Sequence, residues 1–285
     1  IIRDPALNFE KNDCDIDLMI MESTYGDRIH DPVQDLKPQL KQILPRTFER
    51  GGSVIIPAFA YGRTQELLYV IHELYDAGEV PAMPVYVDSP LATNITKVFG
   101  DHPEVYDKET HETFLQQGKN PFAFPQVQFT QSVEASMALM REDRPHVVIS
   151  ASGMCEAGRI LHHLKNNVED PRNTVLIVGW QAPDTLGRRL VERQPVVKIF
   201  GEEYRLKAQV ETINGFSAHA DRTDVIEESM VRLAQHLDAL GVFALTSSGG
   251  SVKKLARYRR DCPERNVAQL FLLGPPRPRQ PAGQL

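Results

Sequence analysis

Cysteine is scarce in this sequence, and its placement limits the metal chemistry that we expect. The three cysteines, Cys14, Cys155 and Cys262, lie far apart and form no C-x-x-C pair. This pattern argues against a zinc site built from thiolates, and it fits the reducing environment of the cytosol. We therefore predict a cytoplasmic protein without cysteine metal ligands.

Long hydrophobic runs are also missing. No apolar stretch reaches the roughly 18 residues that a helix needs to cross a bilayer, so we expect no membrane span. The first segment, IIRDPALNFEKND, is too polar and acidic for a secretory signal. It has no initiator methionine either, which predicts a processed, trimmed or fragmentary chain.

The chain lacks the overall positive charge that is common among nucleic-acid-binding proteins, since its net charge is −6. Residues 252–279 nevertheless hold eight basic and two acidic residues, a net charge of +6 that leaves −12 for the remainder. This basic segment is a candidate phosphate contact. The alternative is a solvated helix face followed by a tail.

What is present is enough apolar material for a proper core. The 285 residues are 41% hydrophobic and 25% charged, which suits one large or two ordinary domains. Short runs rich in Val and Ile alternate with segments of helical periodicity, a pattern that predicts an α/β fold. Their continuous apolar character is typical of parallel strands buried on both faces. We expect strands at Asp17–Met21, Ser53–Pro57, Pro84–Asp88, His146–Ala151, Thr174–Gly179, Val196–Phe200 and Ala208–Ile213, and helices at Thr64–Ala77, Gly158–Val168 and Asp221–Leu240.

Several predicted strands run directly into small residues, as in IIPAFAYGRTQE, YVDSPLAT, ISASGMCEAGR and IVGWQAP. In open α/β sheets, ligands bind in the crevice beyond the carboxyl ends of the strands. Small residues there let a polymer backbone approach closely. Any one of these loops is explained equally well as an ordinary turn, but the set favours a ligand site.

Two segments carry a potential acid or base. ESTYGDR at 22–28 places Glu22 at a strand end, where it can orient a base or a metal ligand, although its small polar residues also suit a helix cap or turn. GFSAHADR at 215–222 places His219 in a small-residue loop before a helix. This position suits a general acid or a phosphate donor, and the alternative is a hydrogen-bonded structural histidine.

Two further segments suit anions. PAFAYGRTQELL at 57–68 places Arg63 near a helix start, where backbone N–H groups and the guanidinium fork favour phosphate. The alternative is a surface pair between Arg63 and Glu66. SASGMCEAGRILHHLK at 150–165 has a small-residue loop that can cradle an anion. Its adjacent His162 and His163 point in different directions on a helix, so at least one is expected to be a surface or packing residue rather than a metal ligand.

Together, in this order, the four segments resemble the β-CASP family of the metallo-β-lactamase superfamily, over about residues 4–241. ESTYGDR is similar to its motif A, FSAHAD to its motif B, and GRTQE and SGM-x-x-x-GR-x-x-H-H to its inserted domain. The resemblance implies a partial αββα metallo-β-lactamase fold with an inserted α/β β-CASP domain, a parallel sheet flanked by helices. The implied order is a first metallo-β-lactamase segment at 1–30, the β-CASP domain at 31–195, a returning segment at 196–250 and a basic, partly disordered tail at 251–285.

The resemblance also implies a chemistry, namely hydrolysis of RNA phosphodiester bonds with two zinc ions in the full-length parent. His219 would donate a proton or hydrogen bond at the scissile phosphate, and Glu22 would orient its ring. The implied substrate contacts are Ser217, Ser152 and Gly153 near the phosphate, with Arg63 farther along the strand. The implied partner is single-stranded RNA, and a homodimer is left open.

The metal ligands are where the sequence departs from the family. The family's H-x-H-x-D-H motif occurs nowhere in the 285 residues, and TSSGG from Thr246 stands where motif C would supply a histidine. Serine and threonine are weak zinc ligands. We therefore expect the chain alone to bind no zinc tightly and to be inactive, with a zinc-dependent ribonuclease as its parent. The alternatives are a non-catalytic RNA-binding or scaffold paralogue and a generic α/β sugar-phosphate-binding protein.

Overall fold

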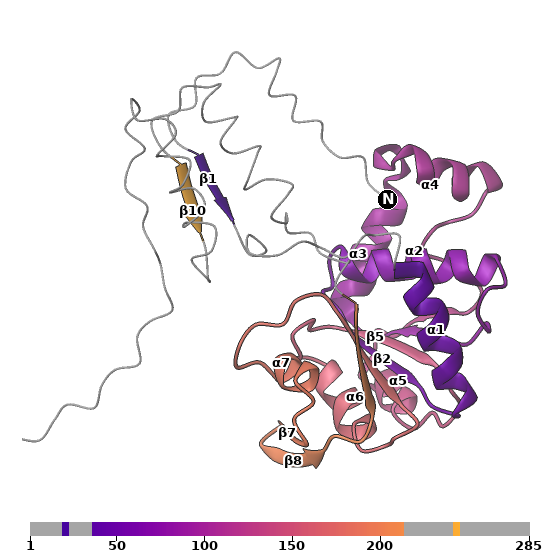
Figure 1. Cartoon of the computed structure of the whole chain (residues 1–285). Helices are drawn as coiled ribbons and strands as arrows, with labels where there is room; N and C mark the ends of the chain where they lie inside the picture. Colours follow the sequence, from indigo (N-terminus) through magenta and orange to yellow (C-terminus); the bar gives the residue numbers. More distant parts are fainter. Residues whose placement is uncertain (1–18, 23–35, 214–241, 246–285) are drawn as a thin grey trace, which may run out of the picture. The chain divides into compact units, whose positions relative to one another are not determined.

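The computed structural model describes residues 19–22, 36–213 and 242–245 (Figure 1). Residues 36–213 belong to one compact unit, and strands β1 (Met19–Glu22) and β10 (Val242–Leu245) belong to another. These two strands pair in parallel, with Glu22 opposite Leu245. The strand expected at Asp17–Met21 is therefore found in the part that the structure describes, shifted to end at Glu22.

The larger unit is built on a six-stranded sheet in which every neighbouring pair is parallel. The α/β fold with a parallel sheet is thus confirmed. All residues of the three strands at its centre, β5 (Val147–Ser150), β2 (Val54–Pro57) and β6 (Thr174–Val178), are buried, as their apolar runs predict. The strand order across the sheet is β4 (Val127–Phe129), β3 (Val85–Val87), β5 (Val147–Ser150), β2 (Val54–Pro57), β6 (Thr174–Val178) and β9 (Gln209–Ile213).

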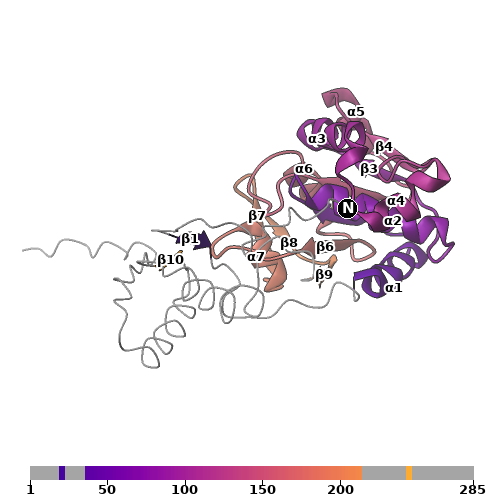
Figure 2. The same cartoon turned by 90° about the horizontal axis from the view of Figure 1, so that it is seen from above.

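Helices cover both faces of this sheet (Figures 1 and 2). Because side chains alternate along a strand, Val54 and Ile56 join one core, and Ile55 joins the other. The first core contains α1 (Leu36–Glu49) and α2 (Arg63–Asp76). The second contains α6 (Ile160–Asn167) and α7 (Leu186–Val191). The helices expected at Thr64–Ala77 and Gly158–Val168 correspond to α2 and α6, and the one at Asp221–Leu240 lies outside the described residues.

Shorter helices link the outer strands β3, β4 and β5. α3 begins after Ser89, whose hydroxyl accepts a hydrogen bond from the Ala92 N–H, and proline occupies its first position. Asp107 and Ser132 cap α4 and α5 in the same way. The elements of this region are α3 (Pro90–Asp101), the 3₁₀ turns η2 (Pro103–Val105) and η3 (Leu115–Gln117), α4 (Lys108–Thr113) and α5 (Val133–Leu139).

One predicted strand has a different environment from the one expected. β7 (Val196–Ile199) is not a buried parallel strand, because it pairs antiparallel with β8 (Glu202–Arg205) and alternates exposed and buried residues. Phe200 and Gly201, with φ of 52° and 81°, make the tight turn between them. The hairpin contacts α6 where the rings of Phe200 and His162 lie 4.7 Å apart. The strand was therefore predicted correctly, but only its alternate residues are buried in the core.

Candidate functional site

The carboxyl ends of β2 and β5 form the switch point of the sheet. These strands are neighbours, yet α2 follows β2 on one face and α6 follows β5 on the other. The loops 58–62 and 151–159 therefore leave the sheet edge in opposite directions. In open α/β sheets such a divergence makes the crevice in which ligands bind.

Loop 58–62 is held firmly by the first turn of α2. The carbonyl of Phe59 accepts hydrogen bonds from the N–H and the hydroxyl of Thr64, at 3.2 and 2.8 Å. The side chain of Gln65 donates to the carbonyl of Ala60 at 3.2 Å. These bonds fix the backbone while leaving the side chains of Phe59 and Tyr61 48% and 69% exposed. The loop thus presents two aromatic rings to solvent on a rigid frame.

Gly153 lies directly against this loop. A Cβ built on Gly153 would come within 2.9 Å of the Phe59 ring and 3.1 Å of its backbone nitrogen, so only glycine fits without movement. The neighbouring Ser152 is half-buried, and its N–H donates to the carbonyl of Ala157 at 3.3 Å. The structure therefore brings the predicted Ser152–Gly153 loop together with the segment that precedes Arg63.

The loop after β6 joins the same surface. The side-chain amide of Gln181 donates to the Gly153 carbonyl at 3.1 Å, and the Gly187 N–H donates to the Met154 carbonyl at 3.1 Å. A Cβ on Gly187 would lie 1.7 Å from the Gln181 side-chain oxygen, so a larger residue there would require the Gln181 side chain to move. Three loops that are distant in sequence thus form one continuous edge, which we call the switch-point edge (58–62, 151–159 and 179–187).

Arg63 is the first residue of α2 and is 9% exposed. Its Nη1 donates to a carboxylate oxygen of Glu66 at 2.6 Å. Burial raises the pKa of Glu66, and the charge of Arg63 partly offsets that rise. The i,i+3 pair considered as the alternative is therefore formed, although Arg63 itself is buried rather than on the surface. Its contact with RNA backbone stays a prediction.

The strongest polar cluster of this unit was not predicted. Asp88, directly after β3, is fully buried. Its carboxylate accepts hydrogen bonds from Ser136 at 2.6 Å, from Arg159 at 2.8 Å and from His163 Nε2 at 2.7 Å. Burial alone would raise the pKa of Asp88, but these three donors outweigh it and hold the pKa below its usual value. Asp88 therefore ties β3, α5 and α6 together as a charged group.

This cluster decides between the two adjacent histidines. His163 is 2% exposed and bonded to Asp88, whereas His162 is exposed and packs on Phe200. His162 is thus a surface residue and His163 a packing residue, which agrees with the position expected for at least one of them. The signal that could have found Asp88 is the one used for Glu22, an acid placed directly after an apolar strand.

The remaining predicted site residues belong to the other part of the chain. Glu22 is the last residue of β1. Ser217 and His219 lie outside the described residues, as does the segment from Thr246. Within the described residues, no group of three or more His, Cys, Asp or Glu side chains is arranged to hold a metal ion. Among them, no helix is both long and apolar enough to cross a membrane.

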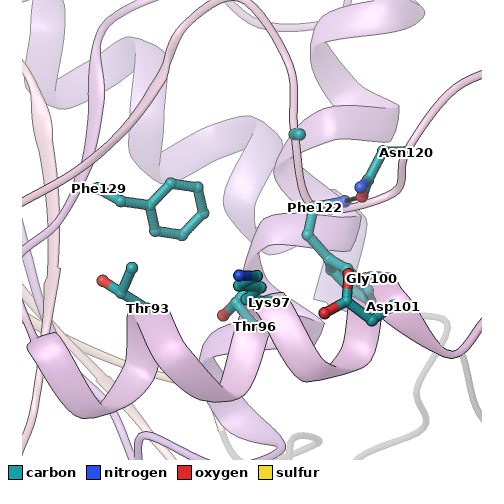
Figure 3. A pocket seen from close by; sticks show the side chains of 9 residues that line it. Thr93, Thr96, Lys97, Gly100, Asp101, Asn120, Phe122 and Phe129 are labelled. Carbon is teal, nitrogen blue, oxygen red and sulfur yellow. Dashed lines mark hydrogen bonds between the residues drawn. The ribbon is translucent and has the colours of Figure 1, made fainter.

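A separate cavity of about 250 Å³ lies between α3 and the segment that leads into β4 (Figure 3). Thr93, Lys97 and Asp101 follow one face of α3 at four-residue spacing, and Phe129 lies opposite them. Phe122 forms part of its wall. No sequence pattern pointed to this cavity, because the segments that form it meet only in the fold.

Comparison with known proteins identifies the family to which this chain belongs. The Beta-Casp domain family matches residues 64–190, and the Zn-dependent metallo-hydrolase RNA specificity domain matches residues 203–228. The chain belongs to the β-CASP family of the metallo-β-lactamase superfamily.

Curated relatives agree with this assignment. Ribonuclease TTHA0252 of Thermus thermophilus is 42% identical over 212 residues, which cover 74% of this chain and 48% of the relative. Transcription termination factor FttA of Methanosarcina mazei is 33% identical over 232 residues, covering 79% of this chain and 36% of the relative. The chain therefore spans about half or less of the length of these relatives.

Proposed function

We propose that this chain supplies the RNA-binding part of a metal-dependent RNA hydrolase, and that it binds single-stranded RNA at the switch-point edge. The observation that carries the proposal is the joining of loops 58–62 and 151–159 where β2 and β5 send their chains to opposite faces. The match to an RNA specificity domain and the ribonuclease relative support RNA as the polymer. The cysteine pattern supports a cytoplasmic location.

The chemistry of the edge suits an unpaired strand. Exposed rings accept nucleobases by stacking, an interaction that tolerates any base sequence. Phe59 and Tyr61 offer such rings on a backbone already fixed by hydrogen bonds, so little conformational entropy is lost when a base binds. The positive end of the dipole of the 14-residue helix α2 lies beside them and favours phosphate, while the N–H groups of Arg63 and Thr64 are already bonded to the carbonyls of Tyr61 and Phe59. Ser152 and Gly153 border the same place.

Zinc belongs to this proposal only through the family description. The described residues offer no metal-binding cluster, and the sequence contains no H-x-H-x-D-H segment. The donors among the described residues do not fit a two-zinc centre, so we derive no hydrolytic step from them. We propose that Glu22 and His219 serve catalysis in a complete enzyme, and that the chain alone binds RNA without cleaving it.

A fluorescently labelled single-stranded RNA, incubated with the chain with and without zinc or manganese, tests this function. We expect binding without cleavage, in both conditions. Replacing both rings, Phe59→Ser with Tyr61→Ser, should weaken binding at least about 30-fold, because two stacked bases are lost and each contributes on the order of 1–3 kcal/mol. Phe200→Ser is the matched control, since Phe200 is 52% exposed on the β7–β8 hairpin, and it should bind as the wild type does.

The outcomes separate the candidate functions. Metal-dependent cleavage would show that the chain alone assembles a catalytic centre and would contradict our proposal of inactivity. Absence of RNA binding would contradict the proposed function itself. The TSSGG segment favours a second candidate, a non-catalytic RNA-binding paralogue. That candidate predicts that adding a second polypeptide that carries the family's H-x-H-x-D-H motif restores no cleavage.

A further inference from the structure

The cavity beside α3 is lined by aromatic rings, a cation and a carboxylate, which are groups that can contact the base and the phosphate of one nucleotide. Phe122 and Phe129 give it aromatic walls. Lys97 and Asp101 lie four residues apart on α3, and both are exposed. Among the described residues, neither has an ion-pair partner within 4 Å, whereas many other surface charges in this unit are paired. A cation and a carboxylate thus stand at an aromatic cavity, open to solvent and outside the ion pairs found among the described residues.

The cavity is connected to the switch-point edge by a row of rings. Tyr61, in loop 58–62, contacts Phe99 edge-on with the ring centroids 5.8 Å apart. Phe99 contacts Phe122 in the same manner at 5.8 Å. Phe122 in turn lines the cavity. Two ring contacts therefore separate an exposed ring of the proposed RNA-binding edge from the cavity wall.

We propose that this cavity is a subsite for an unpaired RNA base that carries an amino group, cytosine in the first place. The inference rests on the proposed function, because it assumes that RNA crosses the switch-point edge. The base stacks on Phe129, Asp101 accepts a hydrogen bond from its exocyclic amino group, and Lys97 contacts a neighbouring phosphate.

The size and chemistry of the cavity agree with this occupant. A volume of about 250 Å³ is below the range of roughly 300–1,000 Å³ that is usual for sites of drug-sized molecules, which favours a single ring system. A carboxylate accepts from the cytosine amino group but repels the carbonyl oxygen that uracil presents at the same position. Asp101 therefore gives the subsite a preference for cytosine over uracil, and Lys97 adds affinity without preference.

Fluorescence anisotropy with labelled oligo(C) and oligo(U) of 12 nucleotides tests the inference on the full chain. We expect wild-type protein to bind oligo(C) about tenfold more tightly than oligo(U), a ratio within the discrimination of a good base contact. Asp101→Asn should bring that ratio close to one. Lys97→Gln should weaken both ligands equally and reduce the slope of log K against log salt by about 0.7, the value for one phosphate contact with a single strand.

Two exposed residues of α4 provide matched controls. Lys108→Gln matches Lys97→Gln, and Glu112→Gln matches Asp101→Asn in the charge that it removes. The side chains of Lys108 and Glu112 are 88% and 54% exposed. Both should keep the wild-type ratio and slope. These substitutions and those on α3 all lie on the surface, so loss of folding does not complicate the comparison.

The two proposals fail differently. If wild-type protein binds neither oligonucleotide, the proposed function is contradicted and this subsite with it. If the wild type binds both, but Asp101→Asn and Lys97→Gln leave the ratio and the slope unchanged, only the subsite is contradicted. Ultraviolet cross-linking of bound oligo(C), followed by peptide mass spectrometry, provides a check without variants, and cross-links at 122–129 support the subsite.

Discussion

Asp88 is the residue whose loss should cost the β-CASP domain the most. Replacing it by asparagine keeps the shape but removes the charge that Arg159 and His163 face. We expect Asp88→Asn to lower the free energy of unfolding by roughly 3 kcal/mol, because it leaves buried donors without a charged acceptor. Urea denaturation followed by circular dichroism measures this.

A partly exposed aspartate, Asp170 with 28% of its side chain exposed, shows whether full burial is the reason. Asp170 also pairs with an arginine, at 2.6 Å from Arg172, but in a turn where the arginine side chain is 62% exposed. Asp170→Asn should therefore change stability by less than about 1 kcal/mol. Equal losses in the two variants would contradict the role assigned to Asp88.

His72 makes the stability of this domain depend on pH. Its ring stacks on Phe124 with centroids 4.7 Å apart, and its Nδ1 lies 3.0 Å from the Pro121 carbonyl. Burial lowers the pKa of His72, so the unfolded chain takes up a proton at higher pH than the folded one. The contribution of His72 to the free energy of unfolding is therefore complete above about pH 6.5. It is lost as the pH falls from there through the lowered pKa of the folded state.

We expect wild-type stability to fall between pH 7.5 and 5, by about 1.4 kcal/mol for each pKa unit that separates the two states. His146 contributes in the same direction, because burial lowers its pKa too. Asp88 acts only below about pH 4, since its folded pKa is lowered from the ordinary aspartate value. His72→Asn should flatten the urea midpoint against pH, while His162→Asn, at an exposed ring, should keep the wild-type slope.

At the residue scale, the sequence predicted positions better than partners. Arg63 was expected at or near a helix start, and it is the first residue of α2. The expected contact of Gly153 with a polymer backbone stays a prediction. The burial of Arg63 was not expected, because it depends on packing between α2 and its surroundings. Asp88 was missed since its three partners come from segments 48 to 75 residues away.

At the scale of elements, the contact between loops 58–62 and 151–159 depends on a missing side chain. Gly153→Ala would force its Cβ against the ring and the backbone of Phe59. We expect a loss of about 1–3 kcal/mol, the usual cost of overpacking, and weaker RNA binding from a displaced loop. Thermal denaturation and RNA affinity measure the two effects.

Gly100 offers the matched substitution in a helix. A Cβ there would meet only the Asn120 side-chain nitrogen at 3.3 Å, which has room to move. Gly100→Ala should therefore be neutral or stabilising by up to about 1 kcal/mol, because alanine favours helix. A similar loss of stability in both variants would show that the contact between Gly153 and loop 58–62 is not the cause of the loss in Gly153→Ala.

The predicted elements that proved correct were those with a continuous or strongly periodic apolar pattern. β2, β5 and β6 are buried along their whole length, and most residues of α2 are buried. The short edge strand β4 was missed because its residues are only partly buried. α3 to α5 were missed because their capping residues, rather than hydrophobic periodicity, define where they begin.

At the scale of the whole molecule, the sequence and the fold agree on the family but rest on different features. Motif order indicated the β-CASP family, whereas the fold shows why its loops matter, since three of them meet at one edge of a parallel sheet. The expected boundaries at 31–195 and 196–250 stay predictions. The same is true of the roles of Glu22, Ser217 and His219.

The central claim is that RNA binds at the switch-point edge. Cross-linking a single-stranded RNA that contains 4-thiouridine to the full chain, followed by peptide mass spectrometry, tests it most directly. We predict cross-links within residues 58–62 and 151–159, and their loss when Phe59 and Tyr61 are replaced by serine. Cross-links confined to the basic segment 252–279, with none at the switch-point edge, would contradict the account.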